Sequence, residues 1–419
     1  MPNKDKNISK RRFKAFENAD AWELRRFSEL AEIRRGLTYS PTSIRKEGIR
    51  VLRSSNIDED TFTFGEDDVF VDKGVVKIPL VKEGDILITA ANGSSRLVGK
   101  HTIIKGLPAN STVHGGFMLL ASCRNPEFVN SLMSSEWYNK FISLYVAGGN
   151  GAIGNLNKND LDNQLVVVPS TSEQSAIGIF FSTLDQQITL HQRKLDKLKH
   201  VKQAYLSEMF PAEGERMPKR RFPGFTDAWE LRKLGELGTL KNGMNFSKDA
   251  MGIGFPFINL QNIFGKNIVD VSQLGLAKAS SIQLKNYNLQ KGDVLFVRSS
   301  VKLEGVGEAA IVPKNLENTT YSGFIIRYRD SFGLDYNFKR FIFGTSNIRN
   351  QIMSQATDSA NKNISQQVLT ELDILVPTLL EQNAIGTFFS ILDQQITLHQ
   401  RKLEKLKNLK KALLNELFV

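Results

Sequence analysis

The chain is poor in the residues that most often build catalytic and metal sites. Its 419 residues include one cysteine, Cys123, and five histidines. A lone cysteine can form neither an internal disulfide nor a structural zinc site, which fits a reducing compartment. No apolar run approaches the roughly 20 residues that span a bilayer. The charged start MPNKDKNISKRRF is followed by no apolar segment, so we expect no signal peptide and a cytoplasmic protein.

Catalytic signatures are also scarce. GGNGAIG at 148–154 contains G-x-G-x-x-G but leads into NLNKNDL and an apolar strand rather than a helix, and TDSANK at 357–362 has no such glycines. NPEF at 125–128 superficially resembles an adenine methyltransferase motif without its second proline. No Walker motif, H-E-x-x-H or metal-spaced cluster occurs. We therefore expect no catalytic residue, no metal site and no cofactor in this chain.

The bulk composition is that of a globular protein with a basic excess. Hydrophobic residues make up 41% and charged residues 24%, and the net charge is +11. The length predicts two or more domains. The positive charge predicts attraction to a polyanion, and nucleic acid is the first candidate.

The most informative feature is an internal repeat. LDQQITLHQRKL occurs at 184–195 and, without one change, at 392–403. Aligning 173–210 with 381–418, an offset of 208, gives 28 identities in 38 positions. A period of this size is far above that of solenoid repeats, which indicates a duplicated whole unit.

The repeat extends beyond this segment. RRFKAFENADAWEL at 11–24 matches RRFPGFTDAWEL at 220–231, and KEGDILI at 82–88 matches QKGDVLF at 290–296. Asn56-Ile57 corresponds to Asn262-Ile263, and VVVP at 166–169 to ILVP at 374–377. The predicted order is therefore domain, helix, domain, helix.

Both long repeats predict helices that pair with each other. Each begins with a capping box, S/T-x-x-E, at Ser170–Glu173 and Thr378–Glu381. Seam residues then follow at alternating steps of four and three, which is the heptad pattern of a coiled coil: Ile177, Phe181, Leu184, Ile188, His191, Leu195, Leu198, Lys202, Tyr205 and Met209, and Ile385, Phe389, Leu392, Ile396, His399, Leu403, Leu406, Lys410, Leu413 and Leu417. The order of domains and helices favours an antiparallel pair. Because Phe210 leads into residues 220–222, we expect its counterpart Phe418 to lie near the equivalent residues 11–13.

The segments between the helices read as mixed α/β. Strand-like runs occur at 51–57, 85–90, 164–169, 256–263, 293–299 and 323–329, and helical segments at 126–145 and 337–354. We therefore expect two homologous mixed α+β domains, separated by two long helices that form an antiparallel, pseudo-two-fold coiled coil. The predicted boundaries are 1–169, a spacer helix and linker at 170–215, 216–377, and a C-terminal spacer helix at 378–419.

Polar and basic loops follow the matched strands of both domains. Arg binds guanine and Asn or Gln binds adenine through paired hydrogen bonds, while Ser and Lys hold phosphates. Solvated loops of a basic protein remain the alternative for any single residue. The candidate DNA-binding residues are Arg53, Ser54, Ser55, Asn56, Asn92, Ser94, Ser95, Arg96, Asn155, Lys158, Asn259, Gln261, Asn262, Arg298, Ser299, Ser300, Lys302, Asn361, Lys362 and Asn363.

The shared twelve residues also carry polar side chains that packing does not explain. The histidines His191 and His399 fall in the seam, where a polar residue often sets register. The remaining Gln and Arg positions favour a partner subunit that docks twice. These candidate docking residues are Gln186, Gln187, Gln192, Arg193, Gln394, Gln395, Gln400 and Arg401.

Together these motifs resemble the specificity (S) subunit of type I restriction–modification systems. The resemblance rests on the duplicated P-[ST]-x-x-E-Q helix, the W-E-L-R segments at Trp22 and Trp229, the strand PFINLQNI and the G-D-[IV]-L segments. It implies two target-recognition domains, each of which reads one half of a split double-stranded DNA site. It further implies docking of two adenine-N6 methyltransferase subunits, recruitment of restriction/translocase subunits, and S-adenosylmethionine, ATP and Mg in those partners rather than here.

The main alternative is a stand-alone two-domain DNA-binding or architectural protein without an enzyme partner. A self-contained methyltransferase or nuclease is the other rival, and the missing catalytic motifs argue against it.

Overall fold

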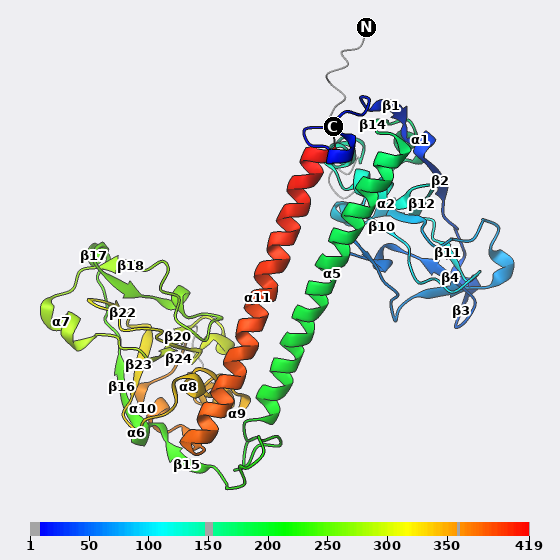
Figure 1. Cartoon of the computed structure of the whole chain (residues 1–419). Coiled ribbons are helices and arrows are strands. Elements are labelled where there is room, and N and C mark those ends of the chain that lie inside the picture. Colours follow the sequence, from blue (N-terminus) through cyan, green and yellow to red (C-terminus); the bar gives the residue numbers. More distant parts are fainter. Residues whose placement is uncertain (1–8, 147–153, 358–360, 419) are drawn as a thin grey trace. The chain divides into compact units, whose positions relative to one another are not determined.

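The computed structural model describes residues 9–146, 154–357 and 361–418 (Figure 1). The chain divides into two compact units. Unit 1 comprises Met1–Gln192 together with Arg401–Val419, and unit 2 comprises Arg193–Gln400. Each unit therefore contains one mixed α/β domain and a part of each long helix.

The two long helices lie where the repeat predicts them, α5 at Thr171–Glu208 and α11 at Leu379–Leu417. The hydroxyl of Ser170 accepts from the Glu173 amide at 3.4 Å, as the capping box predicts. The Glu173 carboxylate does not complete the box, because both its oxygens accept from the Arg12 guanidinium at 2.9 and 2.5 Å. Arg221 holds Glu381 in the same way, at 2.8 and 2.6 Å.

The predicted seam residues are buried or half-buried in both units. In unit 1, Ile177 and Phe181 near the start of α5 share a core with Leu417 and Phe418 at the end of α11. In unit 2, Phe210, just after α5, packs on Phe389 near the start of α11 with ring centroids 6.0 Å apart. The start of one helix thus meets the end of the other within each unit, which confirms the antiparallel pairing.

Charged seam residues make equivalent ion pairs. Lys410 on α11 lies 2.7 Å from Asp185 on α5 in unit 1. Lys202 on α5 lies 2.6 Å from Asp393 on α11 in unit 2. Both aspartates belong to the twelve shared residues, so part of that identity serves the pairing of the helices. His191 is buried, which supports its predicted seam position.

The end of the chain meets its beginning inside unit 1. The Arg11 amide donates to the Glu416 carbonyl at 3.0 Å, and the two side chains form an ion pair. The Arg220 amide donates to the Glu208 carbonyl at 2.9 Å in unit 2, where the chain is continuous. The predicted approach of Phe418 to the segment 11–13 is confirmed by this match.

In unit 1, a four-stranded antiparallel sheet in the order β10-β8-β12-β2 packs against short helices and α5. A second sheet, β11-β4-β7-β3, contains a parallel pair, β11 with β4. The elements are β1 Glu23–Arg26, α1 Phe27–Leu30, β2 Ala31–Arg35, β3 Ile44–Arg45, β4 Ile49–Leu52, β5 Ile57–Asp58, β6 Thr61–Phe62, β7 Val69–Val71, β8 Ile86–Thr89, β9 Ala91–Asn92, β10 His101–Ile103, β11 Thr112–His114, β12 Met118–Cys123, α2 Pro126–Met133, α3 Glu136–Tyr145, β13 Gly154–Asn155, α4 Lys158–Asp162 and β14 Leu165–Val168.

Unit 2 repeats this topology. Its antiparallel sheet has the order β16-β23-β19-β21, and its second sheet, β18-β17-β22, again contains one parallel pair, β17 with β22. The elements are β15 Glu230–Lys233, α6 Leu234–Leu237, β16 Gly238–Asn242, β17 Met251–Ile258, β18 Gly275–Ala277, α7 Ser281–Asn286, β19 Val294–Val297, β20 Ser299–Ser300, β21 Ala309–Ile311, β22 Thr320–Tyr321, β23 Ile325–Asp330, α8 Tyr336–Ile342, α9 Ser346–Ser354, β24 Lys362–Asn363, α10 Gln366–Thr370 and β25 Asp373–Val376.

Two groups of sequence predictions need correction. The helix expected at 126–145 is two helices, α2 and α3, and its counterpart at 337–354 is likewise α8 and α9. The strands expected at 51–57 and 256–263 each end early and continue as 3-10 helices, η4 Ser54–Asn56 and η8 Leu260–Asn262. Both 3-10 helices are closed by an asparagine side chain, Asn56 in η4 and Asn262 in η8.

Candidate nucleic-acid interface

The candidate DNA-binding loops of unit 1 lie side by side. β9 pairs with β13, which sets Asn92 opposite Gly154 and Ala91 opposite Asn155. The Asn92 side chain donates to the Ser54 hydroxyl at 3.0 Å and so joins the loop after β4 to this pair. Three loops that are far apart in the sequence therefore form one polar surface.

Unit 2 gathers the equivalent loops. β20 pairs with β24, which sets Ser299 opposite Asn363 and Ser300 opposite Lys362. A methyl group added at Gly305, in the loop after Ser300, would lie 3.1 Å from the Phe264 ring that follows η8. The predicted sets 259–262, 298–302 and 361–363 thus converge within one domain, as their counterparts do in unit 1.

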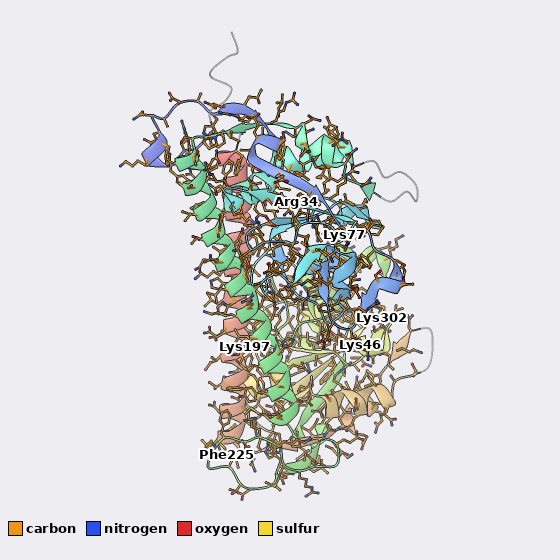
Figure 2. The ribbon with its side chains drawn as sticks, turned by 90° about the vertical axis from the view of Figure 1, so that its right-hand side faces the viewer. Arg34, Lys46, Lys77, Lys197, Phe225 and Lys302 are labelled. Atoms are coloured by element: carbon orange, nitrogen blue, oxygen red, sulfur yellow. The ribbon has the colours of Figure 1, made fainter. Side chains whose placement is uncertain are left out.

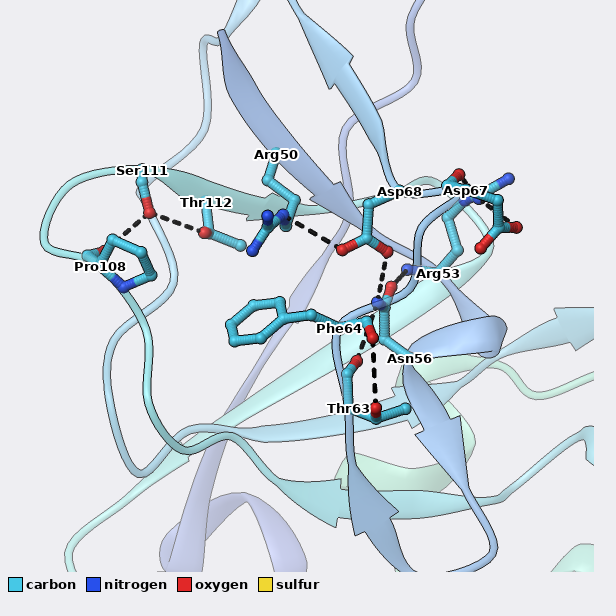
Figure 3. Close-up of polar contacts among 10 residues, drawn as sticks. All are labelled: Arg50, Arg53, Asn56, Thr63, Phe64, Asp67, Asp68, Pro108, Ser111 and Thr112. Atoms are coloured by element: carbon cyan, nitrogen blue, oxygen red, sulfur yellow. Dashed lines mark hydrogen bonds and ion pairs between the residues drawn. The ribbon is translucent and has the colours of Figure 1, made fainter. Parts of the chain in front are cut away.

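Two of the predicted DNA-binding residues, Asn56 and Asn262, have structural roles instead. Asn56 is fully buried and Asn262 is 3% exposed. Asn56 accepts from the Arg53 amide at 2.8 Å and donates to the Asp68 carboxylate at 2.7 Å (Figure 3). Asn262 accepts from the Asn259 amide at 3.0 Å in the same manner. Their recurrence reflects closure of the 3-10 turn, because a buried, satisfied amide has no surface left for a base.

The candidate cations differ in their surroundings. The Arg53 guanidinium lies 3.1 Å from the Asp67 carboxylate and also donates to the Asp67 carbonyl (Figure 3). Lys158 pairs with Asp162 one turn along α4. Arg96 and Lys302 are exposed, and Lys302 is labelled on its loop in Figure 2. Contact of Arg53 with a phosphate would therefore compete with an acidic neighbour, whereas Lys302 lies open to solvent.

The repeated Gly-Asp segments lie just before β8 and β19, at the opposite end of each strand from the candidate loops. Gly84 and Gly292 have φ values of 88° and 90°, which favour glycine because it lacks a Cβ. Asp85 then accepts from Ser122 at 2.7 Å and pairs with Arg34, which is labelled in Figure 2. Asp293 binds Arg329 through both carboxylate oxygens, at 2.8 and 2.6 Å. This match between the copies is explained by folding rather than by ligand binding.

The candidate docking residues lie mainly on exposed parts of α5 and α11. All eight are exposed except Gln192, which is half-buried. Gln187 also lines an open hollow of about 470 Å³ beside the start of α5. The other lining residues are mainly apolar: Phe13, Ala176, Ile179, Phe180, Thr183 and Leu184. An apolar, partly open surface of this kind is typical of interaction sites.

The weak catalytic motifs acquire structural explanations. Asn125 of NPEF caps α2 by accepting from the Phe128 amide, and Phe128 is fully buried. Burial raises the pKa of the Cys123 thiol to about 12, so the reactive thiolate is disfavoured. GGNGAIG lies outside the described residues apart from Gly154. The described ranges contain no group of three or more His, Cys, Asp or Glu arranged to hold a metal ion.

The long helices are also not membrane spans. No helix in the described part of the chain combines the length and apolar character needed to cross a bilayer. Charged residues recur along both α5 and α11, in keeping with helices that expose one side to water.

Sequence reasoning missed one pair of residues at this surface. Phe117 and Phe324 are 69% and 56% exposed, and each lies beside the candidate loops of its own domain. The signal was present in the sequence as GGF at 115–117 and SGF at 322–324, in equivalent places of the two copies.

Duplicated mixed domains, each with a polar and basic loop surface, joined through paired antiparallel helices, define a two-domain nucleic-acid recognition protein. The type I restriction modification DNA specificity domain matches the chain twice, over residues 19–200 and 226–408. The chain belongs to this family, as its motifs predicted. It is a specificity subunit that determines the DNA target of a type I restriction–modification complex, and the catalytic activities of such an enzyme belong to partner subunits.

Individual relatives agree with this assignment. The chain is 25% identical over 383 residues to the type I restriction enzyme EcoKI specificity subunit of Escherichia coli K12, covering 87% of this chain and 81% of the relative. It is 24% identical over 384 residues to the StySPI specificity subunit of Salmonella potsdam, with the same coverage of both chains.

Solved structures show the same fold. The type I restriction–modification S subunit from M. genitalium aligns with a TM-score of 0.61 at 16% identity, over 98% of this chain and 99% of that chain. A second structure, from work on complex assembly and conformational transition of the type I restriction–modification system, aligns with a TM-score of 0.50 at 17% identity, over 95% and 97%.

Proposed function

We propose that the two domains read the two halves of an asymmetric, bipartite double-stranded DNA target. The carrying observation is that the same three loops converge in each domain while their sequences differ. Arg53-Ser54-Ser55 in one copy corresponds to Asn259-Leu260-Gln261 in the other. One fold with different side chains at equivalent places suits two different base sequences.

The proposed DNA surface keeps most of the predicted residues. It excludes the buried Asn56 and Asn262 and consists of Arg53, Ser54, Ser55, Asn92, Ser94, Ser95, Arg96, Asn155 and Lys158 in the first domain, and Asn259, Gln261, Arg298, Ser299, Ser300, Lys302, Asn361, Lys362 and Asn363 in the second. The domain boundaries remain those proposed from the repeat, with recognition domains at 1–169 and 216–377 and helical spacers at 170–215 and 378–419.

The helices are proposed to dock two adenine-N6 methyltransferase subunits, one on each copy of LDQQITLHQRKL. Exposed glutamines recur at 186–187 and 394–395, and packing does not require them. The apolar hollow at the start of α5 adjoins Gln187. Phe222 and Phe388 repeat the contact that Phe13 and Phe180 make at its edge, with centroids 5.8 and 5.5 Å apart. Two similar surfaces suit two copies of one partner.

Restriction/translocase subunits join the same complex, and S-adenosylmethionine, ATP and Mg are bound by the partners. The complex works in the cytoplasm, where its DNA substrate is found.

Methylation mapping tests the DNA-reading role. Genomic DNA is methylated by the partner methyltransferase with and without this chain, and modified adenines are mapped. We expect modification at one split sequence only when the chain is present. A purified chain that binds DNA specifically but forms no complex with a methyltransferase would favour the stand-alone alternative.

Charge placed on the exposed helix surface tests the docking role. Ile179 is 66% exposed and Ile391 is 51% exposed, so Ile179→Asp and Ile391→Asp should leave folding intact. Each variant should reduce the bound methyltransferase from two copies towards one, measured by native mass spectrometry. His200→Ala is the control, because this exposed position on α5 does not line the hollow. Full occupancy in both charged variants would rule out this surface.

A further inference from the structure

Two phenylalanines occupy surface turns that hold them away from the core. Phe117 lies between β11 and β12, and Phe324 lies between β22 and β23. The turns are closed by the Met118 amide, which donates to Gly115 at 2.8 Å, and by the Ile325 amide, which donates to Ser322 at 2.9 Å. With 69% and 56% of their surfaces exposed, the two rings contribute little to core packing.

The same neighbours fix both turns. The Leu52 carbonyl at the end of β4 accepts from Gly115 at 2.9 Å, and the Ile258 carbonyl at the end of β17 accepts from Ser322 at 2.9 Å. A Cβ added at Gly116 would lie 2.9 Å from the Thr38 hydroxyl, so this turn packs closely on the preceding loop. The backbone that carries each ring is therefore fixed before any ligand binds, which lowers the cost of ordering the turn on binding.

Both turns adjoin the proposed DNA surface directly. The amide of Ala90, which lies two residues before Asn92, donates to the Phe117 carbonyl at 2.9 Å. The Arg298 amide donates to the Phe324 carbonyl at 2.8 Å, and the Arg298 guanidinium reaches Gly323 at 3.4 Å. Each ring thus stands next to the strand, β9 or β20, that carries candidate base-reading side chains.

A single exposed phenylalanine is ordinary and needs no explanation. An exposed phenylalanine at the same place in both domains does need an explanation, because the two domains differ in most of their loop residues. The buried matches between the copies, Asn56 with Asn262 and Asp85 with Asp293, are accounted for by folding. An aromatic ring in water at the same place in both copies has no such account.

We propose that Phe117 and Phe324 are specificity-determining DNA contacts, each placing an apolar ring against a base of its own half-site. This inference rests on the proposed function and names side chains that act within it. Such a ring can contact a base in two ways. It lies against a thymine methyl group in the major groove, or it enters between stacked base pairs as a wedge.

The test uses the full chain assembled with its methyltransferase and compares Phe117→Ala, Phe324→Ala and Phe332→Ala. Phe332 is the matched control, since it is 48% exposed and lies just beyond the other end of β23. Binding is measured on the target and on a set carrying single base changes in each half-site. We expect roughly tenfold weaker binding and relaxed discrimination in one half-site for Phe117→Ala and in the other for Phe324→Ala. Phe332→Ala should match the parent.

Two DNA probes separate the modes of contact. Replacing thymine by deoxyuridine removes the methyl group and should reproduce the loss if the ring touches it. A 2-aminopurine reporter should brighten with the parent complex and not with the variant if the ring unstacks a base step. Wild-type discrimination in both phenylalanine variants, alongside target-specific methylation by the parent, overturns this inference alone. A parent complex that recognises no split target overturns the proposed function as well.

Discussion

At the scale of single residues, one buried ion pair joins two repeated motifs. Arg12 of the RRF segment binds Glu173 at the start of α5, 161 positions away, and their side chains are 6% and 1% exposed. Arg221 and Glu381 repeat the pair in unit 2. The capping box explains why a glutamate stands here, but only the approach of the arginine decides what the glutamate binds.

We predict that Arg12→Ala lowers the free energy of unfolding of unit 1 by about 3–5 kcal/mol, because it leaves the Glu173 carboxylate buried without its partner. The urea midpoint of the unit 1 transition measures this. Arg25→Ala, which removes an exposed arginine paired with Glu23 and Glu29, should change the midpoint little. The double variant Arg12→Ala/Glu173→Ala should recover part of the loss, and no recovery would contradict this explanation.

His114 supplies a pH dependence at the same scale. It is 1% exposed at the end of β11, and its Nε2–H donates to the Arg34 carbonyl at 3.2 Å. Burial is the main cause that lowers its pKa from 6.5 to about 4, because the charged imidazole loses its hydration. The folded protein therefore keeps this histidine neutral at a pH where the unfolded chain protonates it.

We predict that this group costs no stability above pH 6.5 and destabilises the fold progressively as the pH falls from 6.5 to about 4, by about 3 kcal/mol in all. Chemical denaturation at several pH values measures the slope. His114→Gln should show a flatter dependence in this window, while His200→Gln, at an exposed position on α5, should keep the parent slope. Equal slopes in all three proteins would refute the assignment to His114.

At the scale of elements, the helices show how a periodic pattern determines structure. The alternating spacing of apolar residues correctly predicted the buried sides of α5 and α11. Prediction was weaker at 126–145, where Ser134 and Ser135 interrupt an apolar run and separate α2 from α3. A serine side chain competes with the helix by forming hydrogen bonds to nearby backbone groups. The Ser134 hydroxyl donates such a bond to the Asn130 carbonyl.

We predict that Phe181→Ala in α5 destabilises unit 1 by about 3–5 kcal/mol, because this fully buried ring would leave a cavity among Phe180, Phe418 and their neighbours. Thermal and urea unfolding measure the change. Leu190→Ala provides the control in the same helix, since its side chain is 43% exposed and should be replaceable at small cost. A comparable loss in the two variants would show that the seam is assigned to the wrong side of α5.

At the scale of the whole molecule, the duplication makes the chain nearly circular in its connections. The Glu416 carbonyl accepts from the Arg11 amide as the Glu208 carbonyl accepts from the Arg220 amide. Glu208 and Arg220 are close in the sequence, whereas Arg11 and Glu416 lie near its opposite ends. We propose that the paired helices also set the number of unread base pairs between the two half-sites. A deletion that preserves the heptad register shortens the helices and so tests this role.

We predict that removing one heptad from each helix, residues 195–201 and 403–409, which spares the proposed docking residues, shortens the gap by roughly three base pairs. Seven helical residues span about 10.5 Å, and DNA rises about 3.4 Å per base pair. Methylation mapping of the assembled complex reads the gap directly, and both half-sites should stay unchanged. An unaltered gap in a complex that still methylates would disprove the spacer role.

The sequence by itself determined the duplication, the two long helices, their antiparallel seam and the family. Repeats and heptads can be read directly from the order of residues, and the order of domains and helices gives the direction of pairing. The sequence also selected the loops that converge in each domain. The tertiary structure decided which of their residues reach the surface: Asn56 and Asn262 close a buried turn, while Phe117 and Phe324 stand exposed. In these irregular loops burial depends on contacts between distant segments, and they have no periodic spacing like that of the helices to predict it.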